Sequence, residues 1–123
     1  MNFKDFSVGA DIENIVRFRK LDKKTDKIFL HKILTNKELK YCFSKNDPAP
    51  HIAGRFSAKE SVVKALGALG ENGLQFNEME ILNDENNVPK VFFKDKRLKK
   101  YKVKLTISHA KDKALGVAVV IKV

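Results

Sequence analysis

The sequence predicts a single α+β domain over residues 1–123, with helices packed on an antiparallel sheet in the order β-α-α-α-β-β-β. Apolar residues recur at helical spacing in the first half of the chain, which indicates helices. Residues 101–108 instead alternate between apolar and polar side chains, the pattern of a strand that is buried on one face. A length of 123 residues fits one domain with a modest core.

The first half of the chain is predicted to be helical after one short strand at residues 6–12. Asp11 is a suitable N-cap for the helix that follows, because its carboxylate can accept hydrogen bonds from free backbone N–H groups of the first turn. Thr25 is a possible cap for a second apolar cluster. Thr35 stands three residues before Glu38, and this capping-box pattern starts another helix.

The second half is predicted to contain one long helix and three strands. The helix runs from about Ile52 to Leu69, after the loop "KNDPAP" and before the breaking segment "GENG". Asn87 can take a positive φ in the turn that precedes a short strand at residues 90–93. The alternating strand and an apolar strand at residues 114–123 are expected to pair as an antiparallel hairpin.

The composition is that of a globular and basic protein. Hydrophobic residues make up 43% of the chain and charged residues 33%, and the formal net charge is +10. This charge favours an acidic partner: a nucleic acid, a membrane surface or an acidic protein. No apolar run approaches the ~20 residues of a membrane span, and no signal-peptide pattern is present. The single Cys42 suits a reducing compartment, so the cytoplasm is the expected location.

The segment "RFSAKESVVKALG" at residues 55–67 carries an unusual set of charges. Helical geometry puts Glu60 and Lys64 on one side of this helix. The opposite side, which is expected to face the core, holds Ala58, Val62, Ala65 and Leu69. By itself the spacing predicts an i,i+4 salt bridge between Glu60 and Lys64, worth about 0.3–0.5 kcal/mol.

Three segments together resemble the motifs of one family. They are "GADIENIVR" at residues 9–17, "RFSAKESVVKA" at residues 55–65, and Ser108-His109 at the end of a strand that precedes a small-residue strand. In this order and spacing they resemble the holo-acyl-carrier-protein synthases, which are 4′-phosphopantetheinyl transferases. The resemblance covers nearly the whole chain, whose length matches the short bacterial type. The turn before Pro89 departs from the family pattern, because Asn87 and Val88 replace a glycine and a basic residue.

The resemblance implies the 4′-phosphopantetheinyl transferase fold and a Mg²⁺-dependent enzyme that uses coenzyme A. Such an enzyme transfers the phosphopantetheine arm of coenzyme A to a serine of apo acyl carrier protein and releases adenosine 3′,5′-bisphosphate. The product is holo acyl carrier protein for fatty acid synthesis. By motif match Asp11 and Glu60 are the metal ligands, since Mg²⁺ prefers carboxylate and phosphate oxygens. Lys64 would neutralise charge that develops on the pyrophosphate.

The resemblance also implies a general base and a set of residues that bind coenzyme A. Serine needs a base at neutral pH, and the candidates are Glu60, acting through a water molecule, and His109. The residues expected to bind coenzyme A are Arg55, Lys59, Lys64, Pro89, Ser108 and His109. None of them is assigned to a particular phosphate.

Basic residues recur at Arg17, Lys20, Lys24 and Lys27, and they form one stripe if a helix continues past Leu21. Because acyl carrier proteins are acidic, the resemblance makes this stripe the expected docking surface, and a solvated helix face is the alternative. The rival function is a small basic nucleic-acid-binding domain. The lysine face of the alternating strand lacks the aromatic pair that an RNA-binding sheet needs, so neither nucleic acid nor membrane is the expected partner.

The C-terminal strand predicts an assembly. Val117, Val119, Ile121 and Val123 lie on one of its faces and Ala118 with Val120 on the other. A strand that is apolar on both faces needs a covering layer on each side, and the helices of 123 residues suffice for one. The second layer is expected from another chain. The family resemblance makes the assembly a homotrimer with its active sites at the subunit boundaries.

Overall fold

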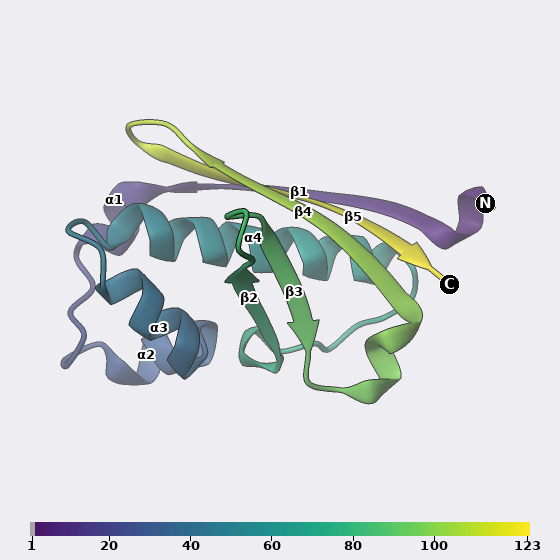
Figure 1. The fold of residues 1–123 in the computed structure, drawn as a ribbon, viewed down its shortest axis with the longest axis horizontal. Coiled ribbons are helices and arrows are strands. Elements are labelled where there is room, and N and C mark those ends of the chain that lie inside the picture. The colour runs from purple at the N-terminus through teal and green to yellow at the C-terminus, as the bar shows by residue number, and fades with distance from the viewer. Residues whose placement is uncertain (1) are drawn as a thin grey trace.

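The structure is a computed structural model that describes residues 2–123, and its architecture is the predicted α+β type (Figure 1). A long helix, α4 (Ala49–Ala68), lies along one face of a three-stranded antiparallel sheet. The sheet consists of β1 (Phe6–Asn14), β4 (Tyr101–His109) and β5 (Lys113–Lys122), and a separate ribbon consists of β2 (Met79–Asn83) and β3 (Pro89–Phe93). The remaining helices are α1 (Ile15–Arg19), α2 (Lys27–Ile33) and α3 (Asn36–Phe43), with 3₁₀ turns at Phe3–Asp5, Phe76–Glu78 and Lys96–Lys100.

The central strand of the sheet is β5, which pairs with β1 on one side and with β4 on the other. Gly116 of β5 stands opposite Asp11 of β1 and opposite Ile107 of β4. The predicted antiparallel hairpin of the last two strands is therefore confirmed. Two hydrophobic clusters form the core, one between α1–α3 and the first half of α4, and one between the second half of α4, the sheet and the ribbon.

Two glycines allow α4 to lie unusually close to the sheet. A Cβ atom at Gly9 would clash with the backbone carbonyl of Ser61, and one at Gly116 would lie 2.6 Å from the backbone nitrogen of Ala58. Larger residues at these positions would push the helix off the sheet. Asp11 follows Gly9 on the same face of β1, so the close approach brings its carboxylate against the side of α4.

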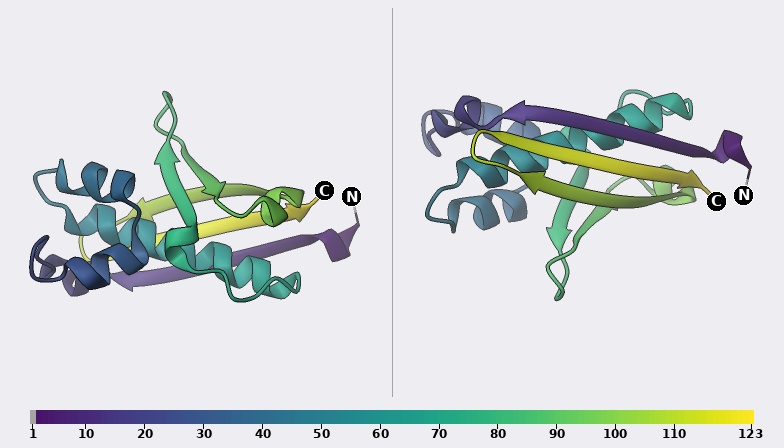
Figure 2. Two further views of the ribbon diagram at one scale, coloured as in Figure 1. Left: turned by 90° about the horizontal axis from the view of Figure 1, so that it is seen from below. Right: turned by 90° about the horizontal axis from the view of Figure 1, so that it is seen from above.

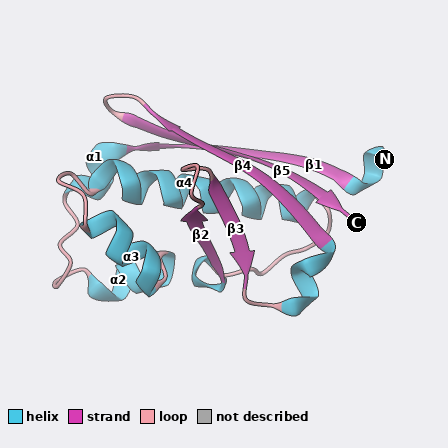
Figure 3. Cartoon of the chain, viewed as in Figure 1, coloured by secondary structure: helices cyan, strands magenta, loops and turns pink. Residues whose placement is uncertain are grey.

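The observed order is β-α-α-α-α-β-β-β-β (Figure 3). The four helical segments that the sequence indicates form four separate helices, where the predicted order has three, and one strand was not predicted. The missing strand is β2, whose five residues pair only with β3. Its pattern is too short to separate a strand from a loop by periodicity alone. Figure 2 shows the ribbon formed by β2 and β3 projecting away from the rest of the domain.

Three predicted helix starts are wrong. Asp11 is no N-cap, because backbone pairing with β5 continues as far as Asn14 and the helix begins only at Ile15. The N-cap of α2 is Asp26 rather than Thr25. The long helix begins at Ala49, inside the predicted loop, because a proline in the first turn needs no intrahelical hydrogen-bond donor.

Other local predictions are confirmed. Thr35 and Glu38 form a complete capping box at the start of α3. Asn87 has φ 62° in the turn between β2 and β3, which is the left-handed backbone that asparagine tolerates. The helix α4 ends at Ala68, before Gly70 with φ 90°.

The face of the sheet that points away from α4 carries no other element of the described chain (Figure 2, right). Its apolar side chains include Val8, Ile12 and Leu115, all of them exposed, with Lys102 and Lys104 at the β4 edge. On the opposite face of β5, Ala114, Gly116, Ala118 and Val120 are buried under α4. The prediction that both faces of β5 are buried is thus confirmed for only one face within a single chain. None of the described helices is long and apolar enough to cross a bilayer.

Candidate functional site

Carboxylates gather where β1 runs beside α4. Asp11 points to the helix from the strand, and Glu60 comes from the side of the helix that faces β1. The Lys64 ammonium lies 3.2 Å from Asp11 Oδ1 and donates a second hydrogen bond to the carbonyl of Ala10. The predicted ion pair between Glu60 and Lys64 is therefore not formed, because Lys64 pairs with Asp11 instead. The structure brings all three motif residues together.

Glu13 is a fourth charged residue at this place, and the sequence prediction does not include it. Because β1 extends through Asn14, Glu13 projects on the same face as Asp11, two positions away. Burial first, and then the nearby Asp11 carboxyl, raise the pKa of Glu13 to about 7 against the opposing charge of Arg17. Arg17 bonds Glu13 Oε1 at 2.9 Å. Burial and the Asp11 charge also raise the pKa of Glu60.

These carboxylates fit a divalent cation. Asp11 Oδ2 is buried and has no hydrogen-bond partner within the described residues, so one acceptor faces inward unsatisfied. The mutual repulsion that raises two carboxyl pKa values would be relieved by a bound cation. No group of three His, Cys, Asp or Glu side chains in residues 2–123 forms a metal cage by itself. Mg²⁺ is commonly held by one or two carboxylates with phosphate oxygens and waters, which needs no such cage.

A pocket of about 170 Å³ lies on the other side of α4, between the helix, the end of β4 and the turn of the ribbon. Arg55, Pro89 and His109 line it, as the sequence predicts for residues that act on one ligand. Arg55 donates to Asn83 Oδ1 at 3.3 Å and lies 4.2 Å from the centre of the Tyr41 ring. The prediction includes neither Asn83 nor Tyr41, since they are distant in sequence and carry no motif.

Ser108 lies outside this pocket. Side chains of β4 alternate between its two faces, so His109 points toward α4 and Ser108 toward the open face of the sheet. The structure therefore does not bring Ser108 to the residues that line the pocket, although the two are adjacent in the motif.

The structure contradicts the predicted role of Lys59 in binding coenzyme A. Its side chain has no exposed surface, and the ammonium lies 2.6 Å from Glu38 Oε1. It also donates to the carbonyl oxygens of Ile33 and Phe76 at 2.8 and 2.9 Å. All three donors of the ammonium are thus used inside the protein, and no ligand can reach them. Lys59 therefore stabilises the fold and does not bind a ligand.

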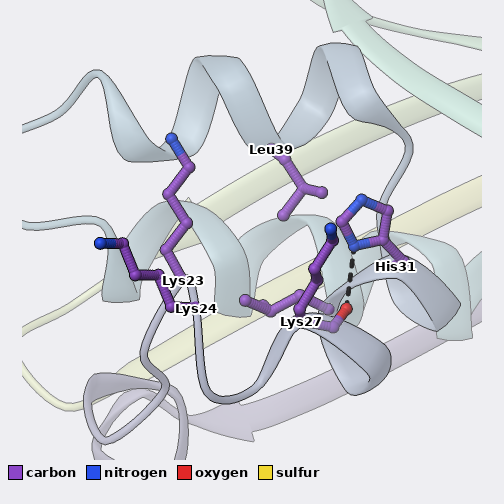
Figure 4. A pocket seen from close by; sticks show the side chains of 6 residues that line it. Lys23, Lys24, Lys27, His31 and Leu39 are labelled. Carbon is purple, nitrogen blue, oxygen red and sulfur yellow. Dashed lines mark hydrogen bonds between the residues drawn. The ribbon is translucent and has the colours of Figure 1, made fainter.

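The expected basic stripe is also different in the structure. The predicted residues Arg17, Lys20 and Lys24 do not share a helix, because α1 ends at Arg19. A turn follows, in which the Asp22 carboxylate accepts hydrogen bonds from the backbone N–H groups of Lys24 and Thr25. Lysines still gather here. Lys23, Lys24 and Lys27 line a hollow of about 390 Å³ together with Leu30, Leu39 and His31, and Lys27 lies beside His31 (Figure 4). The surface is basic with an apolar floor rather than a helical stripe.

The carboxylate group and the Arg55 pocket lie on opposite sides of α4. Arg55 and Glu60 are five residues apart, which corresponds to a rotation of about 140° around a helix. Strand β5 lies between Asp11 and the end of β4 in the sheet, and the helix contacts β5 directly. The pocket around Arg55 has none of Asp11, Glu60 and Lys64 in its lining.

The architecture and these motifs match known proteins. Residues 7–119 match the family model described as ACPS, 4′-phosphopantetheinyl transferase superfamily. Holo-[acyl-carrier-protein] synthase from Chlorobaculum parvum is 39% identical over 113 residues, which covers 92% of this chain and 96% of that protein. The chain belongs to the holo-[acyl-carrier-protein] synthase family. A synthase from Caldanaerobacter subterraneus is also 39% identical, over 122 residues and 93% of each chain.

Solved structures of the synthase family share the fold. The Neisseria meningitidis synthase has a TM-score of 0.79 at 30% identity and covers 94% of this chain and 98% of its own. The Helicobacter pylori synthase, solved in complex with coenzyme A, has a TM-score of 0.78 at 30% identity and covers 92% and 98%. The family assignment from the sequence motifs is thereby confirmed, as is the α+β fold of a phosphopantetheinyl transferase.

Proposed function

We propose that the protein transfers the 4′-phosphopantetheine arm of coenzyme A to a serine of apo acyl carrier protein, releasing adenosine 3′,5′-bisphosphate in a Mg²⁺-dependent reaction. Fatty acid synthesis in the cytoplasm is its proposed setting. The observation that carries the proposal is the meeting of Asp11, Glu60 and Lys64 beside α4, with one buried oxygen of Asp11 unsatisfied, in a chain of the synthase family. Coenzyme A is the ligand in the related Helicobacter pylori structure.

Asp11 and Glu60 would hold the metal ion. A bound Mg²⁺ supplies positive charge next to the pyrophosphate whose bond breaks. Lys64, fixed by Asp11 and by the carbonyl of Ala10, would add a second positive charge to the same oxygens. The Lys64 charge would matter most for the leaving bisphosphate, where negative charge grows during transfer.

The general base removes the proton of the acceptor serine. A carboxylate can accept this proton through a water molecule, and Glu60 is a motif carboxylate that stays partly exposed on the side of α4 facing β1. We therefore propose Glu60, acting through a water molecule, as the base. His109 is the second candidate, and its place at the pocket with Arg55 also suits it to orient a phosphate of coenzyme A.

Incubation of the protein with coenzyme A, Mg²⁺ and an apo acyl carrier protein tests this function directly. Mass spectrometry is expected to show that the carrier protein gains the mass of phosphopantetheine. The rival reading, a basic nucleic-acid-binding domain, predicts no gain of mass and tight retention of RNA on the purified protein. Absence of transfer with a panel of apo carrier proteins would contradict the proposal.

We propose that the acidic carrier protein docks on the basic surface around Lys24, where Lys23 and Lys27 line the hollow and Arg17 and Lys20 are the further residues suggested by the sequence. Reversal of Lys24 to glutamate is expected to raise the KM for carrier protein severalfold and to leave the KM for coenzyme A unchanged. Higher salt should weaken the wild type in the same direction, because exposed charges act through screened attraction. Lys122→Glu, an equal charge change at the far end of β5, is the control. If neither salt nor the Lys24 substitution changes the KM for carrier protein, this surface does not bind the carrier protein.

We also propose a homotrimer whose active sites lie between subunits. Two features support it: the apolar face of the sheet lacks a covering layer, and α4 separates the carboxylates from the Arg55 pocket within one chain. A neighbouring subunit packed on the exposed face could bring one chain's carboxylates to another chain's pocket. Sedimentation is expected to give the trimer mass, and a stable, fully active monomer would contradict it.

If each active site is shared between two subunits, mixed trimers of two inactive variants should recover part of the activity. Asp11→Ala and His109→Ala each disable one half of the site, so each homotrimer is expected to be inactive. Trimers refolded from a mixture contain boundaries where both halves are intact, and part of the activity should return. Separately refolded proteins mixed afterwards serve as the control. If the mixed trimers stay inactive, Asp11 and His109 of one site do not come from different chains.

A further inference from the structure

The pocket around Arg55 is built for an anion. Arg55 exposes 4% of its surface, and its Nε donor is buried with no hydrogen-bond partner among residues 2–123. None of the residues that line the pocket carries a carboxylate. A buried donor without an acceptor costs free energy, so an acceptor from a ligand would stabilise this arrangement.

His51 faces the same pocket from the helix turn before Arg55. Its ring stands edge-on to Tyr41, with 5.7 Å between ring centres, and its centre lies 6.4 Å from that of His109. Within the described part of the chain no group hydrogen-bonds to either ring nitrogen of His51. The imidazole is therefore positioned by its packing, while both of its nitrogens stay free for a ligand.

Charged or titratable groups face His51 from the elements packed around it, and Tyr41 of α3 is one of them. The others are Arg55 on α4, His109 on β4, and Lys45 and Asp47 in the segment before α4. Asp47 is paired with Arg19 at 2.6 Å, so the cations prevail. Burial first, and then Lys45, Arg55 and His109, lower the pKa of His51. An anion in the pocket would replace this repulsion by attraction.

The volume of the pocket limits what part of a ligand enters. About 170 Å³ is smaller than the about 300–1,000 Å³ that encloses a drug-sized ligand, so the pocket takes an end group. Coenzyme A carries such a group in its 3′-phosphate, a monoester. The second pKa of a phosphate monoester is about 6, so it carries nearly two negative charges at neutral pH. Its pyrophosphate, by contrast, belongs at the carboxylate site, where the bond breaks.

We propose that His51 is a specificity residue, which binds the 3′-phosphate of coenzyme A together with Arg55 and takes up a proton from solvent as the phosphate binds. This inference rests on the proposed function for the identity of the ligand. It adds a role for a residue outside the family motifs, and it makes the preference for coenzyme A over 3′-dephospho-coenzyme A depend on pH.

The sign of the pH dependence follows from linkage. The pKa of His51 is lowered in the free protein and raised when the phosphate is bound, so binding takes up a proton between the two values. The contribution to affinity is fully present below the free-protein pKa and is lost as pH rises through the pKa of the complex. The preference for coenzyme A should therefore fall from pH 6.5 to pH 8. Ionisation of the phosphate itself acts in the opposite direction.

Calorimetric titration with coenzyme A and with 3′-dephospho-coenzyme A, at pH 6.5 and pH 8, tests the proposal. Wild-type preference for coenzyme A is expected to be about tenfold higher at pH 6.5 than in His51→Phe, since one pKa unit corresponds to a factor of ten. The two proteins should converge at pH 8. The phenyl ring keeps the packing on Tyr41, and the comparison cancels the ionisation of the phosphate. His31→Phe, which removes an imidazole on α2, is the control and should behave as wild type.

NMR titration of the imidazole of His51 gives a second readout in the unmodified protein. Its pKa should rise on saturation with coenzyme A and stay unchanged with 3′-dephospho-coenzyme A. Equal pKa values in both complexes, or equal pH dependence in wild type and His51→Phe, overturn the role of His51. If transfer to the carrier protein proceeds normally in that case, the proposed function stands. A protein that binds neither ligand overturns both.

Discussion

Replacing Glu60 by glutamine is expected to lower the rate of phosphopantetheine transfer by about 10²–10⁴-fold, the range for loss of a general base. The neutral amide also holds a hard cation poorly, so a metal-ligand role predicts a loss of at least this size. The fold should remain, because glutamine has the same shape and Glu60 is only partly buried. Steady-state rates and the unfolding curve measure the two effects separately. Asp11→Asn should show the same pattern.

The control is Asp112→Asn, which changes an equal charge in the turn between β4 and β5. The Asp112 side chain is 75% exposed and its ion-pair partner is the adjacent Lys113 at 3.2 Å, so wild-type rates are expected. A chelator should abolish the wild-type reaction, and Mg²⁺ should restore it. Unchanged turnover in Glu60→Gln would remove both the ligand and the base assignment from this residue.

Replacing Lys59 by methionine is expected to cost about 3–5 kcal/mol of unfolding free energy, because it leaves the Glu38 carboxylate buried without its partner. Desolvation lowers the pKa of Lys59 even though Glu38 opposes the shift, so burial of this charge is already costly. Denaturant unfolding at a fixed protein concentration measures the loss, since an oligomer has concentration-dependent stability. Lys64→Met is the matched control on the same helix, where the lysine is 52% exposed and an effect below about 1 kcal/mol is expected.

The double variant Lys59→Met with Glu38→Leu separates the ion pair from its surroundings. It should lose less than the sum of the single variants, because no unpaired charge remains. Recovery will be incomplete, since the backbone N–H of Ile81 and the carbonyl of Phe76 lose their partners. Additive losses, or a Lys59→Met protein as stable as Lys64→Met, would show that the buried pair does not tie the ribbon and α3 to α4.

Some predictions that depend on neighbouring residues were confirmed, whereas the Thr25 cap and the Glu60–Lys64 ion pair were not. The capping box of Thr35 and Glu38, the left-handed Asn87 and the alternation of β4 are set by contacts a few residues apart. Predictions that depended on continuing one pattern were not confirmed. The segment after Gly9 has apolar residues at both helical and strand spacing, and only pairing with β5 extends the strand through Asn14. That pairing is what places Glu13 beside Asp11.

The sequence by itself determined the family, the Asp11, Glu60 and Lys64 motif residues and the basic character, because these lie in short segments whose order can be read directly. Only the tertiary structure decided which motif residues are available to a ligand. Lys59 and Glu60 are adjacent, yet helical rotation and the arrival of Glu38 from α3 bury the first and leave the second at the edge of α4. Asn83 and His109 join His51 and Arg55 only because α4, the ribbon and β4 converge there. Such long-range contacts are set by packing, which local sequence patterns do not record.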